Sequence, residues 1–171
     1  MARAWDVPGL GPVTPFREAA GRVLIVRWRE LMSHRDGTLR GEDIEALHAM
    51  RVSSRRLRAA MDAFAAAFPR RGFRRRLRVV KAVTDTLGAA RDLDVSMAAL
   101  GAMLDDLDPV DRPGVEDLIA AQAARRTEEG ARIAGMLEAL EADAFGPRFE
   151  RWVARHTGVS PSALPSGPGG A

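Results

Sequence analysis

Hydrophobic residues recur along most of the chain at intervals of three and four, the spacing that gathers them on one side of an α-helix. These intervals predict helices over residues 15–33, 43–68, 73–104, 115–142 and 147–156. No segment shows the alternation at every second residue that is typical of a β-strand. The pattern therefore predicts an all-α protein, an antiparallel bundle of about four to six helices.

Residues that cap or break helices set the expected boundaries. Thr14 is expected to cap the first helix, with Pro15 in its first position. Asp43 is expected to cap the second helix, which Pro69 and Gly72 would end.

Glycine, proline and small polar residues mark the segments expected to lie outside the helices. Residues 34–43 contain two glycines and are predicted to form a loop, and Gly88 is expected to kink or break the third helix. Residues 1–14 and 157–171 are rich in proline and glycine, so a flexible N-terminal segment and a disordered tail are predicted. Residues 15–156 are therefore predicted to form a single helical domain.

The composition is that of an ordinary globular protein, with 46% hydrophobic and 29% charged residues among 171. No apolar run approaches the roughly 20 residues that span a bilayer, and the N-terminus has no apolar signal core, so a cytoplasmic location is expected. The absence of cysteine excludes disulfides and thiol chemistry.

Positive charge is concentrated in one segment, although the net charge of the whole chain is only +3. Residues 51–81 contain eleven arginines and lysines and a single acid, Asp62, so this segment carries +10 and the rest of the chain −7. Such segregation indicates an anionic partner more strongly than the total charge does.

Helical geometry places many of these charges beside the expected core. On the second predicted helix, four basic side chains fall within an arc of roughly 80° next to the apolar face: His48, Arg51, Arg55 and Arg58. The third repeats the arrangement with Arg74, Arg78 and Lys81. Two such stripes that face each other would form a positive trough in which arginines could bind phosphate oxygens bidentately. The charge pattern alone leaves open a solvated face whose arginine stems cover apolar neighbours.

Two sequence blocks resemble the signature of the CHAD family, the conserved histidine α-helical domains. The first, GEDIEALHAMRVSSRRLRAAMDAF, matches the pattern Glu-x-x-His-x-x-Arg-Val-x-x-Arg-Arg-Leu-Arg from Glu45 to Arg58. The second, LGAARDLDV, matches Leu-Gly-x-x-Arg-Asp-x-Asp-Val from Leu87 to Val95. The resemblance extends from about Pro15 to Trp152, and is looser beyond the second block.

The resemblance implies a helical bundle that binds inorganic polyphosphate through basic side chains lining a groove or pore, without catalysis or a cofactor. The candidate ligands are His48, Arg51, Arg55, Arg56, Arg58, Arg74, Arg78, Lys81, Arg91, Arg125, Arg132 and Arg27. Association with polyphosphate granules is a further expectation. Arg70 and Arg71, expected in the turn at Pro69, should contribute far less to binding.

Domains of this family usually contain two similar halves, whereas this sequence resembles one. The resemblance therefore leaves two arrangements open: two chains pair as a homodimer to rebuild a pore, or one half offers a shallower groove. In the second sequence block, Asp92 and Asp94 are expected to serve as a cap and a buried ion pair, and Arg91 to contact phosphate.

Other functions are less consistent with the sequence. It has no glycine-rich phosphate loop, no nucleophile elbow and no zinc-peptidase motif, so an enzyme is not expected. His34, His48 and His156 are too far apart in sequence to form a metal motif, and no metal site is expected. Nucleic acid remains an alternative anion, although the basic stripes border the core rather than an exposed recognition helix. Binding of an acidic protein is also left open.

Overall fold

The computed structural model describes residues 3–41 and 44–168, and all their regular elements are helical, which confirms the predicted all-α class. Five helices of 13 to 35 residues make up the bundle: α1 (Phe16–Ser33), α3 (Ile44–Ala63), α4 (Arg70–Leu104), α5 (Arg112–Ala142) and α6 (Phe145–Thr157). A short helix, α2 (Arg35–Arg40), lies between α1 and α3, and two single 3₁₀ turns occur at Ala65–Ala67 and Pro161–Ala163.

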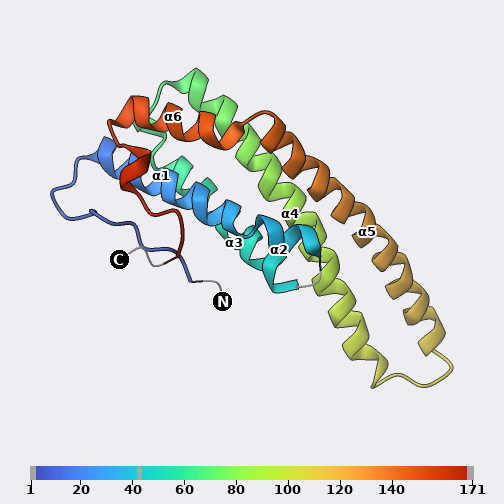
Figure 1. Ribbon diagram of the computed structural model, residues 1–171. Helices are drawn as coiled ribbons and strands as arrows, with labels where there is room; N and C mark the ends of the chain where they lie inside the picture. Colours follow the sequence, from blue (N-terminus) through green and yellow to red (C-terminus); the bar gives the residue numbers. More distant parts are fainter. Residues whose placement is uncertain (1–2, 42–43, 169–171) are drawn as a thin grey trace.

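The helices form a compact body with a long two-helix arm (Figure 1). In the body, α1 packs against α3 and α6, α3 packs against the first half of α4, and α6 contacts the end of α5. The core contains Leu24, Met50, Leu57, Leu87 and Phe149, all with at most 1% exposed surface. The second half of α4 and the first half of α5 run antiparallel beyond this body as the arm (Figure 1).

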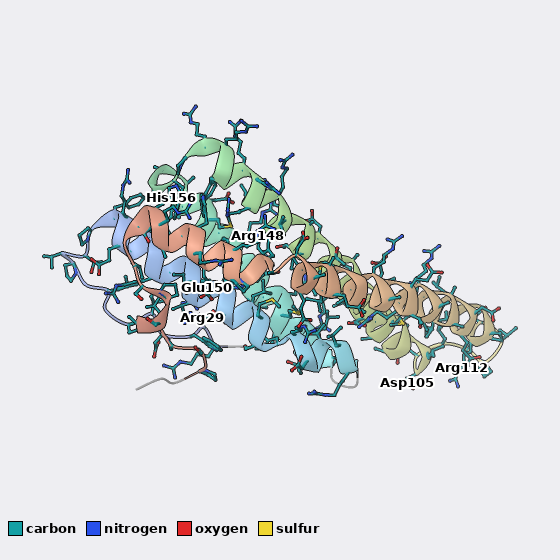
Figure 2. The ribbon with its side chains drawn as sticks, turned by 45° about the horizontal axis from the view of Figure 1, so that its top comes forward. Arg29, Asp105, Arg112, Arg148, Glu150 and His156 are labelled. Atoms are coloured by element: carbon teal, nitrogen blue, oxygen red, sulfur yellow. The ribbon has the colours of Figure 1, made fainter. Side chains whose placement is uncertain are left out.

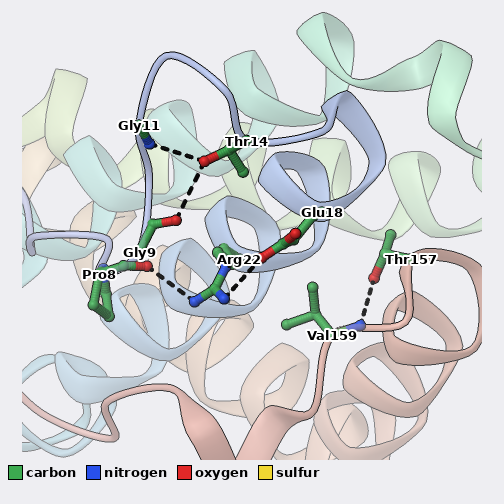
Figure 3. Close-up of polar contacts among 8 residues, drawn as sticks. All are labelled: Pro8, Gly9, Gly11, Thr14, Glu18, Arg22, Thr157 and Val159. Carbon is green, nitrogen blue, oxygen red and sulfur yellow. Dashed lines mark hydrogen bonds and ion pairs between the residues drawn. The ribbon is translucent and has the colours of Figure 1, made fainter.

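Three arginines of α1 hold the two chain ends against the body. Arg22 donates to the carbonyl oxygen of Pro8 and to Glu18, as Figure 3 shows. Arg27 donates to the carbonyl oxygen of Trp5 at 2.7 Å. Arg29 makes a bidentate ion pair with Glu150 of α6, at 2.8 and 2.7 Å, and also donates to the carbonyl oxygen of Leu164. The Glu150 carboxylate raises the pKa of Arg29, and the pair lies between α1 and α6 in Figure 2.

A buried carboxylate joins α1 to α3. Glu30 is 1% exposed, and it accepts hydrogen bonds from Arg27 of its own helix and from Arg56 of α3. The Arg56 contact measures 2.8 Å. A buried carboxylate without partners is destabilising, so the two guanidinium groups offset the cost of burying the charge of Glu30.

The ends of the helices differ in part from the sequence-based expectation. Thr14 does not cap α1. Its hydroxyl accepts from the amide of Gly11 and closes the preceding loop (Figure 3), and Pro15 occupies the cap position. The expected Asp43 cap lies outside the described residues. α3 ends at Ala63, and Pro69 precedes α4 as its N-cap.

Three glycines do not act as the breakers their sequence context suggested. Gly72 lies inside α4, where an added Cβ would come within 3.2 Å of the Trp152 ring, so glycine permits the close approach of α4 to α6. Gly88 also lies inside α4, which continues through it without interruption. The prediction of a loop over residues 34–43 is wrong for residues 35–40, which form α2. This helix includes Gly37, and its C-cap, Gly41, has a left-handed conformation with φ 69°.

Residues after α6 pack against α1, although their composition predicts disorder. Val159 and Leu164 are 7% and 5% exposed. An added Cβ at Gly21 of α1 would lie 2.7 Å from the Val159 side chain, which shows how closely the segment approaches. The buried side chains of Val159 and Leu164 and the hydrogen bond from Arg29 to the Leu164 carbonyl thus hold the segment after α6 against the body.

Candidate functional site

A groove follows the seam where α3 and α4 run antiparallel. Three adjoining hollows of about 640, 720 and 540 Å³ form it. The first two hollows share Asp62, and the last two share Arg70, Arg74 and Leu77. We call this surface the basic groove, after the eight basic side chains that line it: Arg51, Arg55, Arg58, Arg70, Arg71, Arg74, Arg78 and Lys81.

The groove forms because each helix brings one stripe to the seam. In α3, Arg51, Arg55 and Arg58 recur at intervals of four and three, beside the buried Met50 and Leu57. In α4, Arg74, Arg78 and Lys81 recur at the same intervals. The structure therefore places the two predicted stripes along one continuous groove rather than on opposite sides of the bundle.

Charge is unevenly distributed along the basic groove. The hollow between the middle parts of α3 and α4 has three arginines and three carboxylates, those of Asp62, Asp85 and Asp92. The hollow on the first turns of α4 is lined by five basic side chains and no acid. The groove as a whole carries a net charge of +5, and the excess positive charge lies in the hollow on the first turns of α4.

Two of the aspartates face arginines across the seam. Arg51 Nη2 lies 3.9 Å from Asp92 Oδ1, and Arg58 Nη1 lies 3.9 Å from Asp85 Oδ1. These distances exceed a hydrogen bond, and both carboxylates are about three-quarters exposed, at 77% and 75%. Exposed pairs of this kind contribute little stability, so the arginines are held only loosely.

The start of α4 adds a second source of positive potential. The peptide dipoles of a helix leave partial positive charge at its N-terminus, where acidic side chains are normally favoured. The first turn of α4 contains no acidic residue and instead begins with Arg70 and Arg71. An anion bound there would meet both the helix end and the arginine side chains.

Arg70 and Arg71 correct an expectation from the sequence. They were predicted to lie in a turn at Pro69, away from the trough, but they belong to α4 and line the basic groove beside Arg74. The i, i+4 spacing of Arg70, Arg74 and Arg78 was the available signal. It was missed because Gly72 was interpreted as the end of a helix.

Two of the residues predicted to bind polyphosphate instead bind the buried carboxylate of Glu30. Arg27 and Arg56 both direct their guanidinium groups to Glu30, between α1 and α3, and neither lines the basic groove. No sequence pattern indicates this contact, since Glu30 is 26 positions from Arg56. Their role in the described structure is to neutralise an interior charge.

The remaining candidates also lie outside the groove lining. His48 is half-buried on α3, and its Nδ1 is buried without a hydrogen-bond partner in the described structure. Arg91 is half-buried on α4, and Arg125 is exposed on α5. Arg132 is exposed on α5 and binds Glu129 at 3.0 Å.

Of the two aspartates in the second sequence block, Asp94 forms the buried ion pair that was expected. It is 7% exposed, and its Oδ1 accepts from Arg126 Nε of α5 at 2.7 Å. Asp92 is exposed and faces the groove. The two carboxylates, two residues apart, therefore lie on different sides of α4.

One arginine of the basic segment turns away from the groove. The Arg76 guanidinium lies 4.2 Å from the centre of the Trp152 ring on α6. Burial, with smaller contributions from Arg75 and Arg148, lowers the pKa of Arg76. The run of three arginines at residues 74–76 thus divides between the groove and the packing of α4 against α6.

Within the described ranges, no three His, Asp or Glu side chains are grouped so as to hold a metal ion. None of the described helices combines the length and the apolar character needed to cross a membrane.

Comparison with known proteins gives one match. The profile of the CHAD domain family matches residues 22–168, which include all of the basic groove. No curated protein and no solved structure matches the chain.

Proposed function

The chain belongs to the CHAD domain family, and we propose that it binds inorganic polyphosphate in the basic groove as a non-catalytic module. The observation that carries this proposal is the continuous lining of eight basic side chains along the α3–α4 seam.

The chemistry of the lining suits a phosphate chain. Arginine offers a planar fork of donors that matches two phosphate oxygens, and it stays charged at physiological pH. Seven of the eight basic side chains are arginines, and the eighth is Lys81. Like charges so close together repel, so a bound polyanion relieves repulsion that the protein bears without it.

The length of the groove favours a linear anion over a single phosphate. Arg51 and Arg58 are separated by roughly 10 Å along α3, and Arg70 and Lys81 by roughly 16 Å along α4, at the rise of an α-helix. A single phosphate can contact only one part of this lining, and in the hollow between the middle parts of α3 and α4 it must also compete with Asp85 and Asp92. A chain of phosphates contacts several arginines at once. Once one phosphate is bound, its neighbours are held close to the next arginines, so the overall affinity is higher than that of a single phosphate.

The hollow on the first turns of α4 is suited to binding an anion rather than to catalysis. Enzymatic phosphoryl transfer relies on acidic side chains that hold Mg²⁺ and on a base that positions the nucleophile. In the hollow on α4, all the lining residues are arginine, lysine or leucine. The arginine and lysine side chains can hold and neutralise an anion, and this hollow contains no carboxylate to hold Mg²⁺.

Competition between polyanions tests the proposal. Fluorescent long-chain polyphosphate is bound to the full chain and displaced by unlabelled polyphosphate, duplex DNA or poly-glutamate at equal charge concentration. We expect unlabelled polyphosphate to displace the probe at concentrations at least roughly tenfold below the other two. Stronger displacement by DNA or poly-glutamate would favour nucleic acid or an acidic protein as the partner and overturn the proposal.

A further inference from the structure

A second cavity lies on the opposite side of α4 from the basic groove, where four helices meet. Its volume is about 460 Å³, within the range of small-molecule sites. The lining comes from α2 and its C-cap, the start of α3, α4 and α5. It shares no residue with the hollows of the basic groove.

Two residues of the cavity lining have buried polar atoms without a hydrogen-bond partner in the described structure. Asp94 is 7% exposed, and its Oδ1 accepts from Arg126, but its Oδ2 is buried without a hydrogen-bond partner. The hydroxyl of Thr38, which also lines the cavity, is buried and unpartnered as well. A buried carboxylate oxygen without a donor is costly, so Asp94 Oδ2 indicates a place for a group that donates hydrogen bonds.

Arg126 supplies the opposite chemistry beside it. Its Nε is engaged by Asp94, and within the described structure its terminal nitrogens make no hydrogen bond to protein. Nη1 lies 3.6 Å from the position a Cβ would take at Gly130, which itself lines the cavity. A guanidinium with free terminal nitrogens is suited to a carboxylate or phosphate.

Apart from Thr127, the rest of the wall is apolar. Leu39 of α2, Leu47 of α3 and Ile133 of α5 line it, and Leu47 and Ile133 are 2% and 3% exposed in the free protein. A ligand that fits this wall therefore has an apolar part in addition to its charged ends.

From this juxtaposition we propose that the cavity binds a small zwitterion with a short apolar chain, the chemistry of a free aliphatic amino acid. Its ammonium group donates to Asp94 Oδ2, its carboxylate accepts from the terminal nitrogens of Arg126, and its side chain lies against Leu47 and Ile133. The proposal is independent of polyphosphate binding, because the two sites have no lining residue in common.

Titration of the full chain with L-leucine, followed by NMR, tests this site. Isocaproate lacks the ammonium group and isoamylamine lacks the carboxylate, so the two compounds test the two charged contacts separately. Gly130→Leu places a side chain in the cavity beside Arg126, whose Nη1 lies 3.6 Å from the Cβ position, and it should not unfold α5, since leucine favours helix over glycine. Gly135→Leu makes the same change on α5 at an exposed position outside the cavity.

We expect L-leucine to shift the amide signals of Thr38, Leu39 and Gly130, and to bind at least roughly tenfold more tightly than isocaproate or isoamylamine. Gly130→Leu should weaken binding by roughly tenfold or more, and Gly135→Leu should leave it unchanged. The proposal is overturned if L-leucine produces no saturable shift, if the two analogues bind as well as leucine, or if Gly130→Leu binds like the wild type.

Discussion

Arg51 of α3 and Asp92 of α4 face each other across the basic groove, with 3.9 Å between Nη2 and Oδ1, and Arg58 faces Asp85 at the same distance. The protein thus places its own carboxylates where a phosphate chain would bind. These aspartates act as competing anions: they reduce repulsion among the arginines in the free protein and must be displaced or repelled when a polyanion enters.

Removing the competing carboxylates should strengthen polyphosphate binding. Asp85→Asn combined with Asp92→Asn keeps the side-chain size and raises the groove charge by two, so we expect affinity to rise several-fold at low salt. The gain should shrink as salt is added, because these charges are exposed. Calorimetric titration with polyphosphate at low and at high salt measures this gain in affinity.

The matched control for this pair is Asp105→Asn with Asp106→Asn, which changes the same charge at the tip of the arm (Figure 2). An equal gain from both pairs would show that only net charge matters and that the two aspartates do not compete in the groove.

Glu30 should be a major contributor to stability. Glu30→Ala removes the carboxylate that Arg27 and Arg56 share in the interior, and breaking a buried pair typically costs about 3–5 kcal/mol. Urea unfolding of the variant should therefore show a reduced free energy of unfolding of that order. Glu138→Ala, at an exposed position of α5, should change it by less than about 0.5 kcal/mol. Similar values for the two variants would contradict the assigned role of Glu30.

Stability should fall as the solution becomes mildly acidic, partly through His34. Burial lowers the pKa of His34; Glu30 acts in the opposite direction, and Arg56 lowers the pKa further. Because the folded-state pKa lies below the unfolded value of about 6.5, the unfolded chain binds the proton first. The His34 contribution is therefore complete above about pH 6.5 and is lost as the pH falls below that value.

Replacing His34 isolates this effect from that of the carboxylates. We expect the free energy of unfolding of His34→Gln to depend less on pH between about pH 5 and 7 than that of the wild type. Parallel curves for the two proteins over this range would mean that His34 does not protonate differently on folding.

The arm should mediate association between two chains. Val95, Met103 and Leu118 are about half exposed there, and among the described residues no third helix packs on α4 and α5 toward the tip of the arm (Figure 1). Light scattering should show a mass that rises toward a dimer with concentration. Met103→Glu with Leu118→Glu should abolish the rise, whereas Leu10→Glu outside the arm should not. A monomer at every concentration would contradict the prediction.

Helical periodicity was sufficient to predict most of the architecture. The long helices and the two basic stripes follow from spacing alone, because residues three and four apart share a helix face in any helix. Glycine was the main source of error. Gly72, Gly37 and Gly88 lie inside helices, since tertiary packing offsets the roughly 1 kcal/mol that glycine costs there.

The partners of individual charges were not predictable from the sequence. Which aspartate faces Arg51 depends on the register between α3 and α4, and that register is set by the turn that joins them and the packing of both helices. Glu30 likewise meets Arg56 only because α1 packs on α3. Local periodicity identifies the face that a side chain occupies but not the residue opposite it.

The most direct test of polyphosphate binding in the basic groove is a calorimetric titration with long-chain polyphosphate at one ionic strength. Three double variants are compared with the wild type: Arg51→Ala with Arg55→Ala on α3, Arg70→Ala with Arg74→Ala on α4, and Arg151→Ala with Arg155→Ala on the exposed face of α6.

Each variant removes two positive charges, so a diffuse electrostatic attraction would treat the three alike. Each charged hydrogen bond lost in the groove contributes about 1.5–3 kcal/mol before solvent screening. We therefore expect both groove pairs to weaken binding by at least roughly tenfold, with no comparable loss from the α6 pair. Equal losses from all three pairs would contradict the assignment of the basic groove as the polyphosphate site.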